Sequence, residues 1–172
     1  MTHLNYDPYF KDERYNLVNE DRIKLVESWL DKKDTCLDVG CGRGHYLRYL
    51  LKRGYKVHGL EPSQYLIDKD LKGLPVTHGD IDSLKGKYDA LFAMDVLEHI
   101  AHEDIDNCLL KLKKHASKFL YGIANHPDIW EGVELHLIQE PASWWLEKLK
   151  QHYPKVVLFK EGERFNIFEC YV

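Results

Sequence analysis

Hydrophobic and polar positions follow two patterns that alternate along this chain. Short, uninterrupted apolar runs of the kind that form buried strands are followed by segments whose apolar residues recur every three or four positions, as on one face of a helix. The apolar runs predict seven strands, over Thr35–Val39, Tyr55–Leu60, Leu74–His78, Tyr88–Met94, Lys118–Ala124, Val156–Phe159 and Phe165–Val172.

The periodic segments lie between these strands and predict the helices. Strands and helices that alternate at this spacing indicate βαβ units, and therefore an α/β fold with a doubly wound, mostly parallel sheet covered on both faces. The last two strands are separated only by the turn KEGER, so we expect them to form an antiparallel hairpin. Helices are expected over 19–31, Arg43–Arg53, Ser63–Leu71, Asp104–His115 and Pro141–Gln151.

The exit of the first strand carries an unusual loop, within the stretch LDVGCGRGHYL. Gly40, Gly42 and Gly44 occupy every second position there. Because glycine weakens regular structure, the loop must need unusual backbone angles or the close approach of a ligand. In doubly wound sheets, ligands bind beyond the carboxyl ends of the strands, so every strand exit is a candidate site.

The exit of the second strand carries Glu61, 17 positions beyond Gly44. A carboxylate at about this spacing can accept hydrogen bonds from both ribose hydroxyls, which predicts a nucleoside-containing cofactor. A nicotinamide dinucleotide is disfavoured, because the position of the last glycine in its G-x-G-x-x-G fingerprint is occupied by His45. A phosphate-binding P-loop is excluded, because no G-K-[S/T] sequence follows the glycines.

The glycine spacing G-x-G-x-G resembles motif I of the class I S-adenosylmethionine-dependent methyltransferases. The stretch YDALFAMDVLEHI resembles the fourth-strand motif of that family, and the closing hairpin resembles its last two strands. The resemblance covers roughly Thr35–Val172. It implies a Rossmann-like seven-stranded sheet in the order 3-2-1-4-5-7-6 with an antiparallel last strand. It also implies one methyltransferase domain over 1–172, with an N-terminal helical cap (1–33) and a core (34–172).

The same resemblance implies S-adenosylmethionine as cofactor and S-adenosylhomocysteine as product. In the family, the glycine loop bends around the methionine part of the cofactor, and Asp38 stiffens that turn. Glu61 falls where the ribose hydroxyls bind, and Asp80 falls near the adenine amino group with Ile81 beside the ring. Asp95 is expected to hold the methionine end. The cofactor-binding set is thus Asp38, Gly40, Gly42, Gly44, Glu61, Asp80, Ile81 and Asp95.

Several of these residues have a plainer interpretation. Glu61 could be an exposed carboxylate at the start of a helix. Asp80 and Asp82 are both loop acids, and Asp80 is preferred because it comes first after the strand. Arg43 and His45 are expected only to lead the helix that follows the glycines.

His99 is the candidate general base, because an imidazole suits proton removal from a hydroxyl nucleophile near neutral pH. The pattern D-x-x-E-H at Asp95, Glu98 and His99 also resembles E-x-x-E-H of some O-methyltransferases, in which these residues bind a divalent metal. His126 or His136 would complete such a set. The metal is not favoured over the alternative that Glu98 and His99 cap and orient the following helix.

The exit of the fifth strand and the N-terminus supply further candidates. His126 and Asp128 should face the substrate side, with Glu134 and His136 near them in sequence. The aromatic residues Tyr6, Tyr9, Phe10 and Tyr15 precede the first predicted helix. In the family this region often closes over the cofactor, and packing on the sheet edge is an equally good interpretation.

Composition narrows the setting. The net charge is −4, which argues against DNA as a partner. Cys36, Cys41, Cys108 and Cys170 form no C-x-x-C pair and are expected to be reduced thiols. No secretory signal and no apolar run of about 20 residues is found, so we expect a cytoplasmic protein without membrane contact.

Taken together, the sequence predicts a methyltransferase that uses S-adenosylmethionine to methylate a hydroxyl of a small molecule or glycan. Three alternatives remain open. The acceptor could be RNA or protein, the chain could be a nicotinamide-dependent reductase, or it could bind the cofactor as a non-catalytic partner subunit. The acceptor's identity and the oligomeric state cannot be read from these residues.

Overall fold

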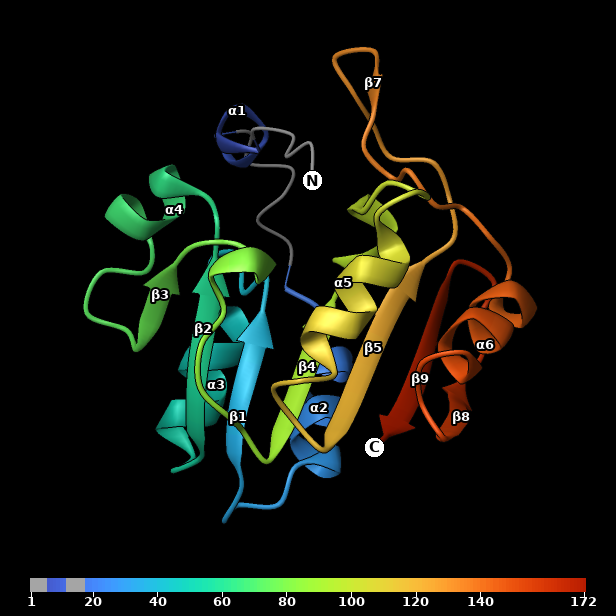
Figure 1. Ribbon diagram of the computed structural model, residues 1–172. Helices are drawn as coiled ribbons and strands as arrows, with labels where there is room; N and C mark the ends of the chain where they lie inside the picture. The colour runs from blue at the N-terminus through green and yellow to red at the C-terminus, as the bar shows by residue number, and fades with distance from the viewer. Residues whose placement is uncertain (1–5, 12–17) are drawn as a thin grey trace.

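A seven-stranded sheet forms the centre of the molecule (Figure 1). The computed structural model describes residues 6–11 and 18–172. The strand order is β3-β2-β1-β4-β5-β9-β8, and β9 is antiparallel to both of its neighbours, which confirms the expected topology. The strands are β1 (Thr35–Val39), β2 (Lys56–Glu61), β3 (Val76–His78), β4 (Ala90–Met94), β5 (Lys118–Ala124), β8 (Lys155–Lys160) and β9 (Phe165–Tyr171).

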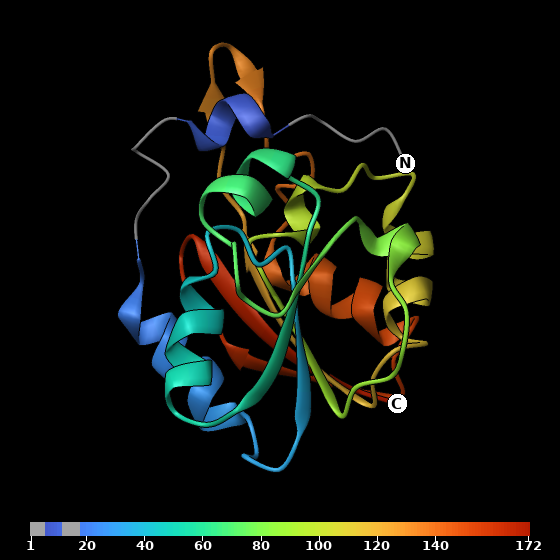
Figure 2. The same cartoon turned by 90° about the vertical axis from the view of Figure 1, so that its left-hand side faces the viewer.

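Helices cover both faces of this sheet (Figures 1 and 2). One buried cluster packs α5 (Ile105–Leu112) and α6 (Ala142–Lys150) against the sheet. The other packs α2 (Glu20–Trp29), α3 (His45–Lys52) and α4 (Gln64–Lys69). Successive residues of β1 and β4 contribute alternately to the two clusters, as side chains of a strand must. The doubly wound arrangement predicted from the sequence is therefore confirmed.

The two central strands explain why their sequences read as unbroken apolar runs. All five residues of β4, ALFAM, are buried, and so are four of the five residues of β1. A parallel strand that is covered on both faces has no solvent side, so it needs apolar residues at every position. Asp38 is the exception in β1, and its burial makes it a candidate for function.

Some elements differ from the expectation. Helix α3 begins at His45 rather than at Arg43, because Gly42 and Gly44 have φ values of 53° and 75°, outside the right-handed helical region. The pattern did not predict α1 (Asp7–Phe10), the hairpin of β6 (Ile129–Trp130) and β7 (Val133–Glu134), or the 3₁₀ turns η2 (Ile81–Ser83) and η3 (Leu97–His99). Each is too short to show a periodic pattern.

The four cysteines are unpaired and buried, as expected for reduced thiols that pack as small apolar residues. Burial raises the pKa of all four thiols, and that of Cys108 reaches about 12. Among the described residues, no helix has the length and apolar character required to cross a membrane.

Candidate active site

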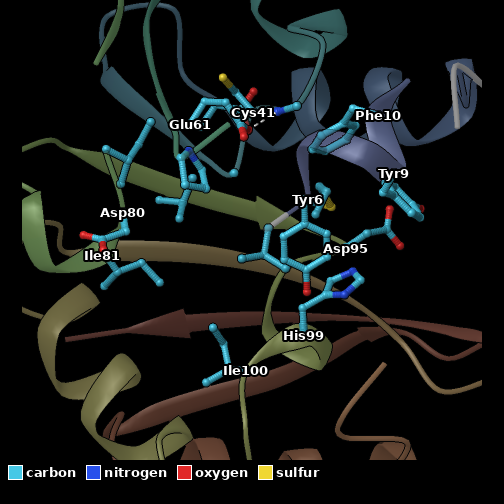
Figure 3. A pocket seen from close by; sticks show the side chains of 18 of the residues that line it. Tyr6, Tyr9, Phe10, Cys41, Glu61, Asp80, Ile81, Asp95, His99 and Ile100 are labelled. Carbon is cyan, nitrogen blue, oxygen red and sulfur yellow. Dashed lines mark hydrogen bonds between the residues drawn. The ribbon is translucent and has the colours of Figure 1, made fainter. Parts of the chain in front are cut away.

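A cavity of about 600 Å³ opens beyond the carboxyl ends of the parallel strands. It is bounded by two walls, which we name here. The glycine-loop wall consists of Asp38, Gly40, Gly42, Glu61, Asp80 and Ile81, at the exits of β1, β2 and β3. The histidine wall consists of Asp95, His99, His126, Asp128 and His136, at the exits of β4 and β5. Figure 3 shows members of both walls with Tyr6 between them.

The glycine loop bends sharply as β1 ends. Gly40 has φ 66° and its amide shares the Leu60 carbonyl with that of Cys41, at 2.8 and 3.1 Å. A Cβ atom on Gly40 would lie 2.7 Å from Cγ2 of Val96, so the position has no room for a side chain. Gly44 does not line the cavity, and a Cβ there would instead lie 2.7 Å from the Leu71 side chain.

Glu61 is buried in the wall rather than exposed at a helix start. Its Oε2 accepts the Gly42 amide at 2.8 Å, and its Oε1 accepts the Ser63 amide at 2.9 Å. Burial raises the pKa of Glu61 to about 6, although these two hydrogen bonds favour the charged form. Each carboxylate oxygen has a second lone pair, so Glu61 can still accept hydrogen bonds from a ligand in the cavity.

Asp38 lies beneath the glycine loop and is the least satisfied acid of this wall. It is 2% exposed, and its Oδ2 has no hydrogen-bond partner among the described residues. Burial and the nearby charge of Glu61 raise the pKa of Asp38 well above its usual value. Buried polar atoms are nearly always paired, so an unpaired oxygen on a cavity wall indicates a site for a donor or cation supplied by a ligand.

The exit of β3 holds the two acids Asp80 and Asp82, of which the sequence analysis preferred Asp80. Asp80 lines the cavity and caps η2 by accepting the Ser83 amide at 3.0 Å. Ile81 follows it as a buried apolar residue of the same wall. Asp82 forms an ion pair with Lys111 and is not part of the cavity lining. The position therefore supports Asp80 over Asp82.

Asp95 lines the cavity just after the end of β4, and 43% of its side chain is exposed. Its Oδ2 lies 2.7 Å from Nη1 of Arg22 on α2, and the Arg22 guanidinium stacks 3.3 Å from the centre of the Phe165 ring. Burial raises the pKa of Asp95 even though Arg22 acts in the opposite direction. Sequence reasoning missed Arg22, because the two residues are 73 positions apart.

His99 is held as a neutral ring with one nitrogen left available. Its Nδ1 donates to the Leu135 carbonyl at 2.8 Å, which leaves the lone pair on Nε2. Burial, followed by the neighbouring His136, lowers the pKa of His99 to about 4. The adjacent Glu98 is fully buried and accepts the Ala124 amide through Oε1 at 2.8 Å. Its Oε2 has no partner among the described residues.

The loop between β5 and α6 completes the histidine wall. Glu134 organises this loop by accepting the amides of Asp128 and His136 through one oxygen, at 2.8 and 3.0 Å. The His136 Nδ1 donates to the His126 carbonyl at 2.6 Å, and its ring centre lies 4.8 Å from that of His99. His126 and Asp128 thus face the cavity as predicted. His136 faces it as well, while Glu134 binds backbone amides.

Within residues 6–11 and 18–172, Glu98, His99 and His136 form a group that could hold a metal ion. One potential ligand atom from each lies within 4.8 Å of the other two. Both histidines donate Nδ1–H to a backbone carbonyl, as metal-ligating histidines commonly do, and the unpaired oxygen of Glu98 supplies a carboxylate. The group includes His136 rather than His126. Asp95, which the D-x-x-E-H pattern suggested as a ligand, pairs with Arg22 instead.

The N-terminal segment covers the cavity. Tyr6, Tyr9 and Phe10 line it, whereas Tyr15 lies outside the described residues. Arg43 does more than lead α3, because its guanidinium forms an ion pair with Asp70 at 2.6 Å and donates to the Phe10 carbonyl. The glycine loop is thereby tied to α1.

Comparison with known proteins matches residues 10–157 to the family model described as a methyltransferase domain. The ubiquinone biosynthesis O-methyltransferase of Coxiella burnetii is 30% identical over 127 residues, which cover 66% of this chain and 54% of that protein. The ribosomal protein L11 methyltransferase of Campylobacter concisus is 29% identical over 136 residues, covering 71% and 48%. The chain thus spans about half the length of the curated relatives it matches.

The fold is also found in solved structures. The magnesium protoporphyrin IX methyltransferase of Synechocystis PCC 6803, solved with bound S-adenosylhomocysteine, superposes with a TM-score of 0.71 at 18% identity. The match covers 96% of this chain and 97% of that one. At this level of identity, the likeness concerns the fold.

Proposed function

The chain belongs to the methyltransferase domain family, and from this premise we propose that it transfers a methyl group from S-adenosylmethionine to a hydroxyl. The acceptor is a small molecule or glycan, and S-adenosylhomocysteine is released. The observation that best supports this cofactor is the buried, unpaired Oδ2 of Asp38 beneath the glycine loop, with Glu61 in the same wall. The ammonium group of the cofactor's amino-acid tail would pair with the unpaired oxygen of Asp38. Its ribose hydroxyls would donate to the lone pairs that Glu61 has left.

Each residue of the glycine-loop wall has a task in this proposal. Asp38 receives the ammonium group of the cofactor, and the bare backbone at Gly40 and Gly42 lets the tail approach. Glu61 accepts the two ribose hydroxyls, while Asp80 approaches the adenine amino group and Ile81 packs on the ring. Asp95, neutralised by Arg22, lies at the methionine end. The acids of this cavity favour a positively charged donor over the neutral product.

His99 takes the acceptor's proton. The hydroxyl oxygen attacks the methyl carbon from about 3 Å, in line with the sulfur, which leaves as a neutral thioether. As the C–O bond forms, the oxygen becomes positively charged and its proton becomes strongly acidic. A base with a pKa of about 4 is therefore strong enough when the proton moves to Nε2 of His99 during bond formation.

The group Glu98, His99 and His136 fits a divalent cation, by its donor set and by its unpaired Glu98 oxygen. Such an ion would bind Nε2 of His99 and would therefore replace the base role of that residue. It would instead supply Lewis-acid stabilisation of the acceptor's alkoxide. Titration with Mn²⁺, followed by electron paramagnetic resonance, tests this part without an activity assay. Binding that is lost in His136→Ala and kept in His126→Ala supports the cation. Equal signals in all three proteins, or no binding to any of them, contradict it.

The O-methyltransferase relative supports a hydroxyl acceptor, and the net charge of −4 disfavours nucleic acid. The similarity to a ribosomal protein L11 methyltransferase makes a protein acceptor the competing possibility. A screen of hydroxyl, amine, RNA and protein acceptors with a labelled methyl donor separates these classes. Transfer to RNA that weakens steeply with salt would overturn the proposed acceptor class. Cofactor binding without transfer to any class would indicate a non-catalytic partner subunit.

Calorimetry tests the cofactor itself. We expect S-adenosylmethionine and S-adenosylhomocysteine to bind and NADH not to bind. Glu61→Ala should weaken binding of both methyl compounds by at least tenfold, since two hydrogen bonds to a charged group are lost. Unchanged affinity in Glu61→Ala would remove the ribose assignment. Once an acceptor is known, His99→Ala should lower turnover by about 10²-fold or more, and full turnover would remove the base assignment.

A further inference from the structure

Tyr6 places a phenol between the two walls of the cavity. It immediately precedes α1, and its ring packs edge-on against the His99 ring, with centres 5.4 Å apart and planes at 83°. Figure 3 shows the Tyr6 ring inside the cavity with its hydroxyl directed toward the side where His99 lies. The sequence analysis named Tyr6 only as one of four aromatic residues before the first predicted helix, and no motif or strand exit distinguished it from the other three.

The hydroxyl of Tyr6 is buried and has no hydrogen-bond partner among the described residues. An unpaired buried hydroxyl destabilises the folded protein, so most buried hydroxyls are paired. A nearby backbone carbonyl or side chain could have satisfied it, as Asp128 satisfies the Tyr9 hydroxyl at 3.3 Å. The unpaired group therefore indicates a partner that arrives with a ligand.

The chemistry of the phenol makes this hydroxyl a donor. A phenol has an ordinary pKa of about 10, so it is protonated near neutral pH. The phenol therefore keeps its proton at physiological pH and cannot serve as a base. His99 presents the opposite character, because its Nδ1 donates to the Leu135 carbonyl and the lone pair on Nε2 is left free. A donor and an acceptor thus stand side by side at the edge of one cavity.

A hydroxyl is the group that complements this pair. It can donate its proton to His99 and accept a hydrogen bond from Tyr6 at the same time. One lone pair of its oxygen then remains for the methyl carbon. An amine cation has no lone pair to accept from Tyr6, and an ether has no proton to give to His99. The pair therefore selects for the chemistry of the acceptor as well as for its position.

Contacts at both ends of α1 hold Tyr6 in place. On the glycine-loop side, the Ser63 hydroxyl and, at 3.4 Å, the Tyr65 amide donate to the Asp7 carboxylate, and Arg43 donates to the Phe10 carbonyl. On the histidine side, Tyr9 donates to Asp128. Ser63 also donates its amide to Glu61, so the residues that would hold the cofactor also anchor the segment that carries Tyr6.

We infer that Tyr6 is an acceptor-binding residue whose hydroxyl donates a hydrogen bond to the acceptor oxygen while His99 receives that oxygen's proton. The inference rests on the proposed function, because it assigns the substrate class, a neutral hydroxyl, to the same cavity. It goes beyond that function by adding a contact from the N-terminal segment to the histidine wall.

The test compares two small probes that differ by one hydroxyl group. The affinities of 4-fluorobenzyl alcohol and 4-fluorotoluene are measured by ¹⁹F NMR titration in the presence of saturating S-adenosylhomocysteine. In the wild-type protein, the alcohol should bind more tightly. Tyr6→Phe should reduce this advantage by about three- to tenfold, the value of one net hydrogen bond. Tyr49→Phe is the matched control, since Tyr49 donates to Glu27 outside the cavity and should keep the advantage.

Two results would overturn the inference. One is an alcohol that gains nothing over the fluorotoluene in the wild-type protein. The other is an advantage that survives unchanged in Tyr6→Phe. Calorimetry of S-adenosylhomocysteine with each protein keeps this failure apart from failure of the proposed function. If the wild type binds S-adenosylhomocysteine and only the probe result is negative, Tyr6 is wrong and the cofactor assignment stands. If the wild type does not bind it, both fall together.

Discussion

The glycine-loop wall and the histidine wall are held in place by different kinds of contact. In the glycine-loop wall, the carboxylate of Glu61 is fixed by the amides of Gly42 and Ser63, and Asp80 is fixed by Ser83 three positions later. These partners come from the loops that end β1, β2 and β3, where the parallel register of the strands already brings them together.

The histidine wall is assembled from segments that are far apart in the chain. His99 is fixed by Leu135, 36 positions away, and Asp95 by Arg22, 73 positions away. Tyr6 reaches it from the N-terminus. The register of the strands is therefore enough to bring together the glycine-loop wall, which we propose binds the cofactor. The histidine wall, which we propose binds the acceptor, depends on which loops and terminal segments lie over the sheet.

The largest effect is expected in the histidine wall, on the pH dependence of protein stability. The lowered pKa of His99, about 4 against an ordinary 6.5, means that the folded protein takes up this proton less readily than the unfolded chain. The neutral His99 ring therefore contributes its full stabilisation above pH 6.5. This stabilisation is lost as the pH falls, and the free energy of unfolding should be about 3 kcal/mol lower at pH 4 for this reason. Urea unfolding from pH 7 to pH 4 should show the loss, and His99→Asn should reduce it.

The difference between the wild type and His99→Asn isolates this effect. Glu61 acts in the opposite direction, because its raised pKa gives stability below pH 4.5 that is lost as the pH rises through 6. That contribution is common to both proteins and cancels. An identical pH dependence in the two proteins would show that His99 is not the titrating group.

Gly40→Ala tests the glycine-loop wall and should have the next largest effect. Its Cβ would meet Val96 at 2.7 Å on a backbone with φ 66°. We expect the free energy of unfolding to fall by about 2 kcal/mol and the affinity for S-adenosylhomocysteine to fall more than tenfold. Gly54→Ala is the control, with φ 84° and open space around its Cβ. It should cost about 1 kcal/mol and leave the affinity unchanged. Equal effects of both variants on affinity would contradict the close approach at Gly40.

Because the pKa of Glu61 is raised to about 6, a third test is the pH dependence of cofactor affinity. At pH 5 only about one-tenth of this group is ionised in the free site, so binding that needs the carboxylate should be about tenfold weaker than at pH 7. Calorimetry of S-adenosylhomocysteine at both pH values measures the ratio. Glu61→Gln should bind more weakly and lose most of this dependence. A dependence that persists in full would move the effect to another acid, with Asp38 as the first to examine.

Arg22→Ala should have the smallest effect and shows whether α2 couples the two walls. Its ion pair with Asp95 is partly exposed, so its loss should weaken S-adenosylhomocysteine binding only about threefold. Lys24→Ala is the control on the same helix, since Lys24 pairs with Glu20 on the exposed face. Affinity that falls equally in both variants would indicate a general change of α2 rather than a role for the pair.

The sequence predicted the parts of the molecule that depend on local pattern. The seven strands, their order and the reversal of β9 were foreseen, and β1 and β5 have the predicted ends. Asp38, Glu61, Asp80 and Ile81 line one cavity, as expected for residues at adjacent strand exits. Gly44 was assigned to the cofactor as the third glycine of the motif that the loop resembles. It lies outside the cavity lining, and a Cβ atom there would meet Leu71, because glycine spacing does not reveal which way the loop bends. Its part in cofactor binding stays a prediction.

The remaining features could not be read from pattern. Arg22 lies on the polar side of an amphipathic helix, where a cation is ordinary, and only the tertiary fold brings it to Asp95. His136 was one of two candidates beside His99, and the choice depends on Glu134, which bends the loop through two backbone amides. Tyr6 acquires its position from contacts with α4 and Asp128 that no local rule encodes.

The buried thiols allow the local opening of the protein to be measured by chemical labelling. A thiol reagent attacks thiolate sulfur that it can reach, and in this fold all four sulfurs are covered and held protonated. Alkylation must therefore wait for the surrounding structure to open, so its rate reports how often each region does so. Cys41 lines the cavity, while Cys108 on α5 and Cys170 on β9 belong to the buried cluster between the sheet and helices α5 and α6. Their labelling rates distinguish loosening of the pocket from unravelling of the core within a single chain.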